Sequence, residues 1–208
     1  MDPTTQHQSP PPPTPRGPKR APGAPVGPLQ VRAAVIDAGA TLFGEHGVSA
    51  VSLRDIAAGA NVETALIRRY VGPRHAVIDE VFRSVSSQVV DELEAKPLGQ
   101  LEFGRQSNLG RWMTMLTYYN VRGIPAPSEG PSPVETLATI LDRTSQIGME
   151  AARIRAAQIT AISIGWRLFE GHLVTLANIA DQPLPALRDD INAIQRLIAG
   201  TPWPTPPA

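Results

Sequence analysis

The sequence predicts an all-α protein with two helical domains. Apolar residues recur at helical spacing along most of the chain, and no convincing run of alternating apolar and polar residues indicates a strand. Glycine and proline separate the helical segments, with stops at Gly47 and Gly200 and new starts after Gly72 and at Pro133. We expect an N-terminal domain of three helices that contains a helix-turn-helix, followed by a larger helical domain.

The two ends of the chain lack the residues needed to build a core. Ten of the 22 prolines fall in the first 30 residues, which contain no aromatic residue. We therefore expect residues 1–29 to form a disordered arm, with the basic residues Arg16, Lys19 and Arg20 near its folded end. Residues 30–83 are expected to form the first domain, residues 84–200 the second, and residues 201–208 a tail.

Composition excludes several classes of protein. The chain has no cysteine, which excludes disulfides and thiolate chemistry, and its four histidines lie far apart, so neither a metal site nor a cofactor is expected. No apolar run reaches about 18 residues and no signal peptide is recognisable, which predicts a cytoplasmic protein without membrane association. The net charge is zero, but residues 1–30 carry three basic side chains and one acidic side chain, the balance expected of a DNA-binding end.

Local signals divide the first domain into three helices. The first has an apolar face and ends at Gly47, a residue that readily takes a left-handed conformation. Ser52 as N-cap, with Asp55 three residues later, predicts a second helix over residues 53–59. After a turn at Asn61, a third helix is expected over residues 63–70. The apolar face of the first helix consists of Val31, Val35, Ala38 and Leu42.

The second half of the chain continues the helical pattern. A long apolar stripe predicts a fourth helix that reaches about residue 94 and finishes before Pro97. Further helices are expected around residues 109–119, within residues 148–180 and around residues 187–198. No repeat of 20 to 50 residues is apparent, so a solenoid is not expected.

The clearest helix start in the chain lies at Ser132. Its side chain is suited to cap the helix, and Pro133 occupies the first helical position without losing a needed hydrogen-bond donor. Glu135 stands three residues after the cap, from where its carboxylate can reach back to the backbone of the cap. These residues predict a helix that begins with a complete capping box.

Residues 52–71, SLRDIAAGANVETALIRRYV, have the layout of a helix-turn-helix. Ala57 permits a close approach of the two helices, because a larger side chain there would push them apart. Asn61 stands at the turn, where a residue that tolerates positive φ is needed. Val62 and Ile67 supply a small core beneath the second helix, which is short enough to enter a major groove about 12 Å wide.

Residues 31 to about 83 resemble the N-terminal domain of TetR-family (TetR/AcrR-like) transcriptional regulators. Residues 152–180 are similar to the penultimate helix of many actinobacterial members. The resemblance implies a homodimer on operator DNA, with the last two long helices of each subunit paired in a four-helix bundle and the basic arm reaching the minor groove or nearby phosphates. The residues that carry the first resemblance are Ala38, Leu42, Phe43, Gly47, Val48, Leu53, Ile56, Ala57, Ala60, Val62, Ile67, Tyr70 and Ala76.

The sequence departs from the family pattern at the expected DNA face. Glu63 stands where family members usually have a capping serine, and Arg68 where they usually have a phosphate-contacting tyrosine. The arginine can replace a hydroxyl contact by a charged one, whereas the glutamate suits the positive end of a helix but repels a nearby phosphate. Val71 replaces the usual phenylalanine, and Arg74 replaces the usual lysine while keeping its charge. The operator sequence and the affinity stay open.

The resemblance assigns a group of residues to DNA. The alternative interpretation is a charged face that contacts only solvent. The residues expected to contact phosphates or the groove are Ser52, Arg54, Arg68, Arg69, Tyr70 and Arg74, and those expected at the base-facing start of the recognition helix are Thr64 and Ala65.

Large, adaptable apolar side chains gather in the middle of the second domain. They suit a pocket for a hydrophobic or aromatic effector, and equally an ordinary core. The pocket candidates are Phe103, Trp112, Met113, Leu116 and Tyr119. The candidates for the dimer interface, some of which could instead pack within the subunit, are Ile154, Gln158, Ala161, Ile162, Gly165, Phe169, Leu173, Ile191, Ile194 and Ile198.

Together these features predict a ligand-responsive transcriptional regulator and no enzyme. A dimer would present two recognition helices to an inverted repeat, and an effector would release it by changing their spacing or angle. Repression is the family default, and activation stays open. A small helical hydrolase or transferase is one alternative, but the chain has no serine elbow, glycine-rich phosphate loop or cysteine nucleophile. A protein-binding adaptor that has lost DNA binding is the other, favoured by Glu63 and the zero net charge of residues 31–83.

Overall fold

The computed structural model describes residues 24–101, 104, 106–130 and 132–200, and this part of the chain contains eight α-helices, two short 3-10 helices and no strand. The predicted all-α class is therefore confirmed. Most of the predicted arm, including Arg16, Lys19 and Arg20, lies outside the described residues, as do Phe103 and the predicted tail. The helices are α1 (Pro28–His46), η1 (Val48–Ala50), α2 (Leu53–Gly59), α3 (Thr64–Tyr70), α4 (Arg74–Ala95), η2 (Leu98–Gln100), α5 (Asn108–Val121), α6 (Pro133–Ser145), α7 (Met149–Leu176) and α8 (Leu184–Gly200).

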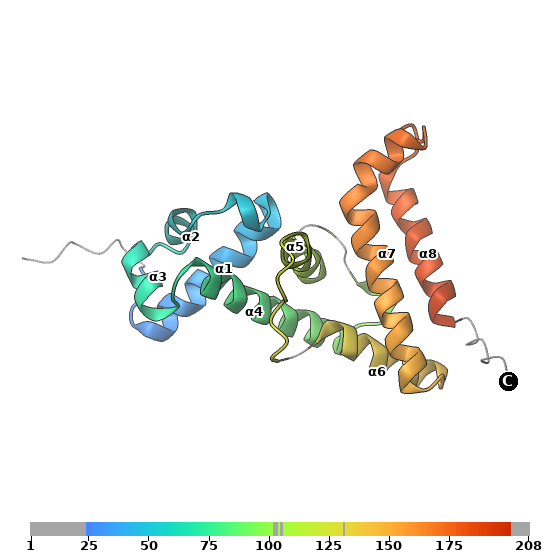
Figure 1. Ribbon diagram of the computed structural model, residues 1–208, viewed down its shortest axis with the longest axis horizontal. Helices are drawn as coiled ribbons and strands as arrows, with labels where there is room; N and C mark the ends of the chain where they lie inside the picture. The colour runs from blue at the N-terminus through green and yellow to red at the C-terminus, as the bar shows by residue number, and fades with distance from the viewer. Residues whose placement is uncertain (1–23, 102–103, 105, 131, 201–208) are drawn as a thin grey trace, which may run out of the picture.

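The helices form an elongated molecule with two different ends (Figure 1). Helices α1, α2 and α3 lie at one end, and α7 and α8 form an antiparallel pair at the other. Helix α4 runs from the first group toward the second, and it packs against α1, α5 and α6. It crosses residues 83 and 84 without a break, so the two predicted domains share one continuous helix.

Most helix ends follow the local signals. Gly47 ends α1 with a φ of 79°, and its N–H donates to the carbonyl of Phe43 over 3.0 Å. Asn61 takes a φ of 52° at the turn between α2 and α3, as predicted. Such left-handed conformations suit glycine and asparagine better than other residues. The sequence therefore places these turns correctly because it determines them locally.

The start of α6 differs from the prediction in one respect. The Ser132 hydroxyl accepts a hydrogen bond from the Glu135 N–H over 3.3 Å, as expected of the cap. The Glu135 carboxylate, however, receives hydrogen bonds from Arg153 on α7, from Nε over 3.0 Å and from Nη2 over 2.6 Å. Arg153 holds the pKa of Glu135 below its ordinary value. The expected return of Glu135 to the cap is wrong because a charged partner on another helix binds the carboxylate instead.

A continuous apolar core joins α1, α4 and α5. Val35 and Phe43 of α1 and Val81 and Val85 of α4 are fully buried, as is Met115 of α5. A second, smaller cluster packs α6 against α7, and its buried members are Leu137, Ala138, Leu141, Ala152 and Ala156. The first core therefore fixes the orientation of α1 on α4, and with it the end of the molecule that carries α2 and α3.

The closest approach of α1 to α4 occurs at Gly39. A Cβ atom on Gly39 would lie 2.8 Å from the Cγ2 atom of Val81, which is fully buried and β-branched. A β-branched side chain is stiff at χ1, so Val81 cannot easily turn away. Glycine is needed at this position to let the two helices cross.

We expect Gly39→Ala to lower the free energy of unfolding by about 1–2 kcal/mol. Overpacking a core costs about 1–3 kcal/mol, which exceeds the gain of about 0.5–1 kcal/mol for alanine over glycine in a helix. The matched control is Gly171→Ala in α7, where a Cβ atom would meet nothing within 4 Å. This control should gain stability in the same urea titration followed by circular dichroism. Equal stabilisation by both substitutions would contradict the tight crossing.

Candidate nucleic-acid interface

A complete capping box starts α2. The backbone N–H of Ser52 donates to Oδ2 of Asp55 over 2.7 Å, and the N–H of Asp55 donates to the Ser52 hydroxyl over 3.3 Å. These hydrogen bonds with the side chain and backbone of Ser52 hold the pKa of Asp55 below its ordinary value, so the carboxylate stays charged at neutral pH. Two otherwise unpaired backbone donors are satisfied, which fixes where α2 begins.

The turn and a small core hold α3 against the rest of the domain. Ala57 is 5% exposed, and its carbonyl accepts the Val62 N–H over 3.0 Å. Ile67 is the one buried residue of α3 and is completely inaccessible. Leu66 and Tyr70 pack partly against the same core, so α3 turns only the side that carries Ala65, Arg68 and Arg69 outward. The sequence-predicted roles of Ala57, Asn61, Val62 and Ile67 in the fold of this motif agree with this geometry.

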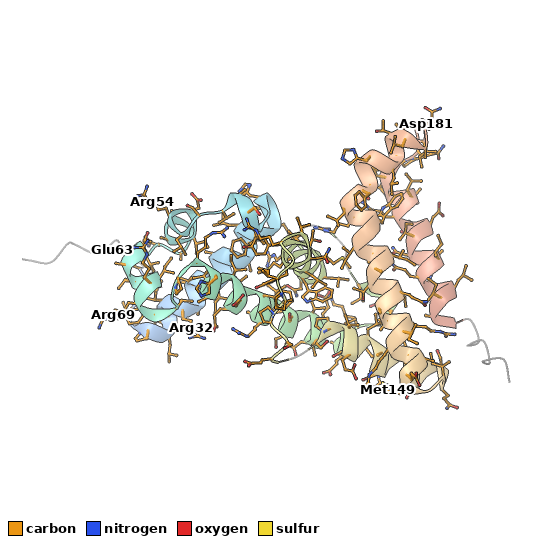
Figure 2. The ribbon with its side chains drawn as sticks, in the orientation of Figure 1. Arg32, Arg54, Glu63, Arg69, Met149 and Asp181 are labelled. Atoms are coloured by element: carbon orange, nitrogen blue, oxygen red, sulfur yellow. The ribbon has the colours of Figure 1, made fainter. Side chains whose placement is uncertain are left out.

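Three exposed arginines lie on the outer side of α2 and α3. They are Arg54, Arg68 and Arg69, and none of them makes a salt bridge with any carboxylate in the described part of the chain. Figure 2 shows Arg54 and Arg69 extending away from the body of the molecule. The guanidinium of Arg69 lies 5.3 Å from the centre of the Tyr70 ring, which orients it without neutralising it. By contrast, Arg32 on α1 is paired with Glu80.

The start of α3 is less well capped than that of α2. Glu63 occupies the N-cap, and its side chain accepts no capping hydrogen bond. Ala65 is exposed in the first turn, whereas Thr64 and Tyr70 are half-buried. Thr64 and Ala65, the residues predicted to face the bases, therefore follow a glutamate whose carboxylate makes no capping hydrogen bond with the backbone.

Two predicted contact residues have structural partners of their own. Ser52 takes part in the capping box of α2. Arg74, at the start of α4, donates from Nε to the Val51 carbonyl over 3.1 Å, from Nη2 to the same carbonyl over 2.9 Å, and from Nη2 to the Val48 carbonyl. It ties η1 and the start of α2 to α4. Sequence reasoning missed this role because the partners lie 23 and 26 residues away.

A cavity of about 110 Å³ lies among α4, η2, α5, α6, α7 and α8. Two of the predicted pocket residues, Trp112 and Met113, line it, and Leu116 and Tyr119 are not part of its lining. Tyr119 is buried between α4 and α5, where its hydroxyl donates to Oδ1 of Asp79 over 2.6 Å and its ring meets that of Phe82 edge-on at 5.2 Å. Burial, followed by this hydrogen bond, raises the pKa of Tyr119.

The predicted dimer residues divide into two groups. The exposed group contains Ile154, Gln158, Ala161, Phe169, Leu173 and Ile194. The half-buried group, which also packs within the subunit, contains Ile162, Gly165, Ile191 and Ile198. Leu168 and Leu176 are exposed apolar residues of α7 that the prediction omitted. Continuing the three- and four-residue spacing from Ile154 along α7 would have found them.

Two further features bear on the class of protein. In the described ranges no group of histidine, cysteine, aspartate and glutamate side chains is arranged to hold a metal ion. None of the helices in those ranges is long and apolar enough to span a bilayer. The capped pair α2 and α3, with its outward arginines, is the feature that calls for a functional explanation.

Comparison with known proteins gives that explanation. Residues 35–72 match the family described as bacterial regulatory proteins, tetR family. The chain is 28% identical over 178 residues to the HTH-type transcriptional repressor Rv3405c of Mycobacterium tuberculosis strain H37Rv, and to the same extent to the HTH-type transcriptional regulator Mb3439c of Mycobacterium bovis. Each match covers 84% of this chain and 92% of the relative. The matched residues contain α2, the turn and α3, so this part of the chain is similar to the helix-turn-helix of the TetR family of transcriptional regulators.

Proposed function

We propose that this protein is a homodimeric repressor that binds an inverted-repeat operator through α3 and leaves it when a small hydrophobic or aromatic effector binds the second domain. The observation that carries the DNA contact is the set of exposed arginines without salt bridges, Arg54, Arg68 and Arg69, beside a helix anchored by Ile67. Phosphates are the partners that such cations lack within the subunit. That one relative is named a repressor supports repression.

The proposed dimer rests on α7 and α8. Helix α8 has 17 residues, and its only buried residue is Gln195. A helix gains most of its stability from packing an apolar face, so α8 needs more cover than its own subunit supplies. Both helices also carry exposed apolar side chains, for example Phe169 on α7, which is 54% exposed, and Ile194 on α8, which is 45% exposed. Pairing with the same helices of a second subunit would cover them in an isologous interface.

The effector site that we propose is the cavity beside α5. Leu109, Trp112 and Met113, near the start of α5, line it. The same helix also packs against α1 and η1 of the DNA-binding end. A ligand that shifts α5 would therefore act directly on the part of the molecule that positions α3, and the energy available is the difference in ligand affinity between the two arrangements.

The two rival functions find less support. A hydrolase or transferase would need a cluster of catalytic groups, and the described cavity is lined by no carboxylate and no histidine. A protein-binding adaptor would not need unpaired arginines on the outer side of α2 and α3. Residues 84–200 are thus proposed as the effector and dimerisation domain, and residues 30–83 as the DNA-binding domain.

The DNA contact is tested by Arg68→Ala together with Arg69→Ala. On DNA from upstream of its own gene, the double variant should bind more weakly and lower the slope of log affinity against log salt by roughly two to four, since each lost phosphate contact contributes about 0.9 and a dimer loses four arginines. The control, Arg122→Ala with Arg143→Ala, removes the same charge from two exposed positions that form no salt bridge with a described carboxylate, after α5 and on α6, and should leave affinity and slope unchanged. Unchanged affinity and slope in the first variant would defeat the assignment.

The role of Arg74 is separated from that of Arg68 by stability measured without DNA. Arg74→Ala should lower the free energy of unfolding by about 1.5–3 kcal/mol, because two carbonyls lose a charged donor. Arg68→Ala, on an exposed face, should stay within about 0.5 kcal/mol of the wild type. Urea denaturation of both variants provides the measurement. If Arg74→Ala is as stable as Arg68→Ala, the link between η1 and α4 contributes nothing measurable.

The dimer is tested by Phe169→Glu. A buried, unpaired charge costs about 3–5 kcal/mol, so the dimer should dissociate at least roughly 100-fold more readily. The folded subunit should be little affected, because Phe169 is more than half exposed. Val121→Glu, at an apolar position 78% exposed on α5, is the matched control and should stay dimeric. Sedimentation equilibrium measures the oligomeric state of the wild type and both variants. A wild type that is monomeric at micromolar concentration would refute the interface.

A further inference from the structure

The cavity has two chemically different sides. Helices α4, α5 and α6 and the segment around η2 supply only apolar side chains and the Trp112 ring, for example Leu93, Leu101 and Leu137. Helices α7 and α8 supply all the remaining polar side chains of the lining. These polar residues are Thr160, Ser163, Asn192, Gln195 and Arg196. A ligand that matches this division has an apolar body and one polar end.

The charge on the polar side is positive. Arg196 is the one charged residue among the lining residues, which include no aspartate or glutamate. It is exposed and makes no salt bridge with a described carboxylate, unlike Arg188 earlier on α8, which binds Glu170 through hydrogen bonds of 2.9 and 2.7 Å. The polar end of the cavity therefore offers an unneutralised guanidinium at the surface, a group that binds carboxylates in a two-pronged geometry.

Two buried polar residues of the lining, Gln195 and Ser163, are already paired with each other, whereas the indole Nε1 of Trp112 is buried without a hydrogen-bond partner in the described part of the chain. The side-chain amide of Gln195 donates to the Ser163 hydroxyl over 2.6 Å, and that hydroxyl donates to the Ile159 carbonyl over 2.8 Å. The Ser163 hydroxyl and one amide N–H of Gln195 are committed within the protein, so a ligand gains little from them. Thr160, Asn192 and the Trp112 indole can add neutral hydrogen bonds, but the one charge in the lining that can select an anion belongs to Arg196.

The volume limits the size of the apolar body. An apolar cavity of about 150 Å³ is large enough to hold benzene, and this one measures about 110 Å³. Because this volume is smaller than that of the cavity that holds benzene, the apolar body of a ligand can be no larger than about one ring. The head group then lies at the surface end of the cavity, beside Arg196.

We propose that this cavity binds a compact apolar molecule, about one ring in size, that carries a single anionic group, and that Arg196 recognises the anion. The inference deepens the proposed function and depends on it only in treating the ligand as the effector. The ligand class follows from an apolar cavity of limited volume with one unneutralised cation at its polar end.

Three isosteric probes that differ in charge test the proposal: benzoate, benzamide and benzamidine. Their dissociation constants for the full chain are measured without DNA by NMR titration, with the Trp112 indole resonance, identified by Trp112→Phe, reporting occupancy of this cavity. Benzoate should bind at least about tenfold more tightly than benzamide, since a charged hydrogen bond is lost. Benzamidine should bind more weakly still, and acetate, which lacks the ring, should not bind measurably.

Arg196→Gln identifies the residue responsible. It should remove the preference for benzoate and leave benzamide within about twofold of the wild type, because a neutral head group loses no charged partner. Arg143→Gln, an exposed arginine on α6 away from the lining, is the control and should change none of the constants. Equal affinities for the three probes, no binding of any, or a preference that survives Arg196→Gln would overturn the proposal.

Failure of this ligand-binding test can be told apart from failure of the proposed DNA-binding function. Because DNA is absent, loss of operator binding cannot imitate loss of the ligand. A chain that binds its operator but shows no preference for benzoate overturns this inference alone. A chain that prefers benzoate through Arg196 supports the site, whether or not it binds DNA.

Discussion

The crossing of α1 over α4 determines where the functional parts of this protein lie. Gly39 lets the two helices approach so closely that a single methyl group would collide with Val81. From that crossing α4 extends in both directions, to Arg74, which holds η1 and the start of α2, and to Leu93, which lines the cavity. One continuous helix thus connects the proposed DNA-binding end with the proposed effector site. Since packed helices shift as units, filling the cavity can change the position of α3 without unfolding either end.

The sequence predicts the features that are determined locally and misses those that depend on distant partners. The Ser52–Asp55 capping box and the left-handed turn at Asn61 depend on neighbours within three residues, and both are present. Glu135 has the same local pattern as Asp55, yet Arg153 from another helix takes its carboxylate. Nothing in the order of residues indicates which of the two partners a glutamate will find. Side chains from six helices line the cavity, so its lining could not be derived from one segment.

The polar contacts of α8 explain how this helix keeps its place with so little apolar burial. Arg155, itself 3% exposed, donates to the Ala199 carbonyl over 2.9 Å near the end of α8, and Gln195 binds Ser163 in the middle. Arg188 binds Glu170 near its start, and holds the pKa of Glu170 below its ordinary value, so this tie weakens only as acid protonates the carboxylate. Hydrogen bonds contribute about 0.5–1.5 kcal/mol each. Directional bonds of this size set the orientation of a helix, while its apolar face remains available to a second subunit.

In the proposed complex, Glu63 and the arginines of α3 face different parts of the duplex. Along the axis of a helix that rises about 1.5 Å per residue, Arg68 and Arg69 lie roughly 7 to 9 Å from Glu63, which is about one Debye length at physiological salt. The effect of the carboxylate on the attraction of these arginines for their own phosphates is therefore partly screened. Its influence is local to the first turn of α3, beside Ala65, where a carboxylate repels phosphate but accepts a hydrogen bond from the amino group of cytosine. In the proposed complex, the departure from serine at this position changes which bases are read more than how strongly the duplex is held.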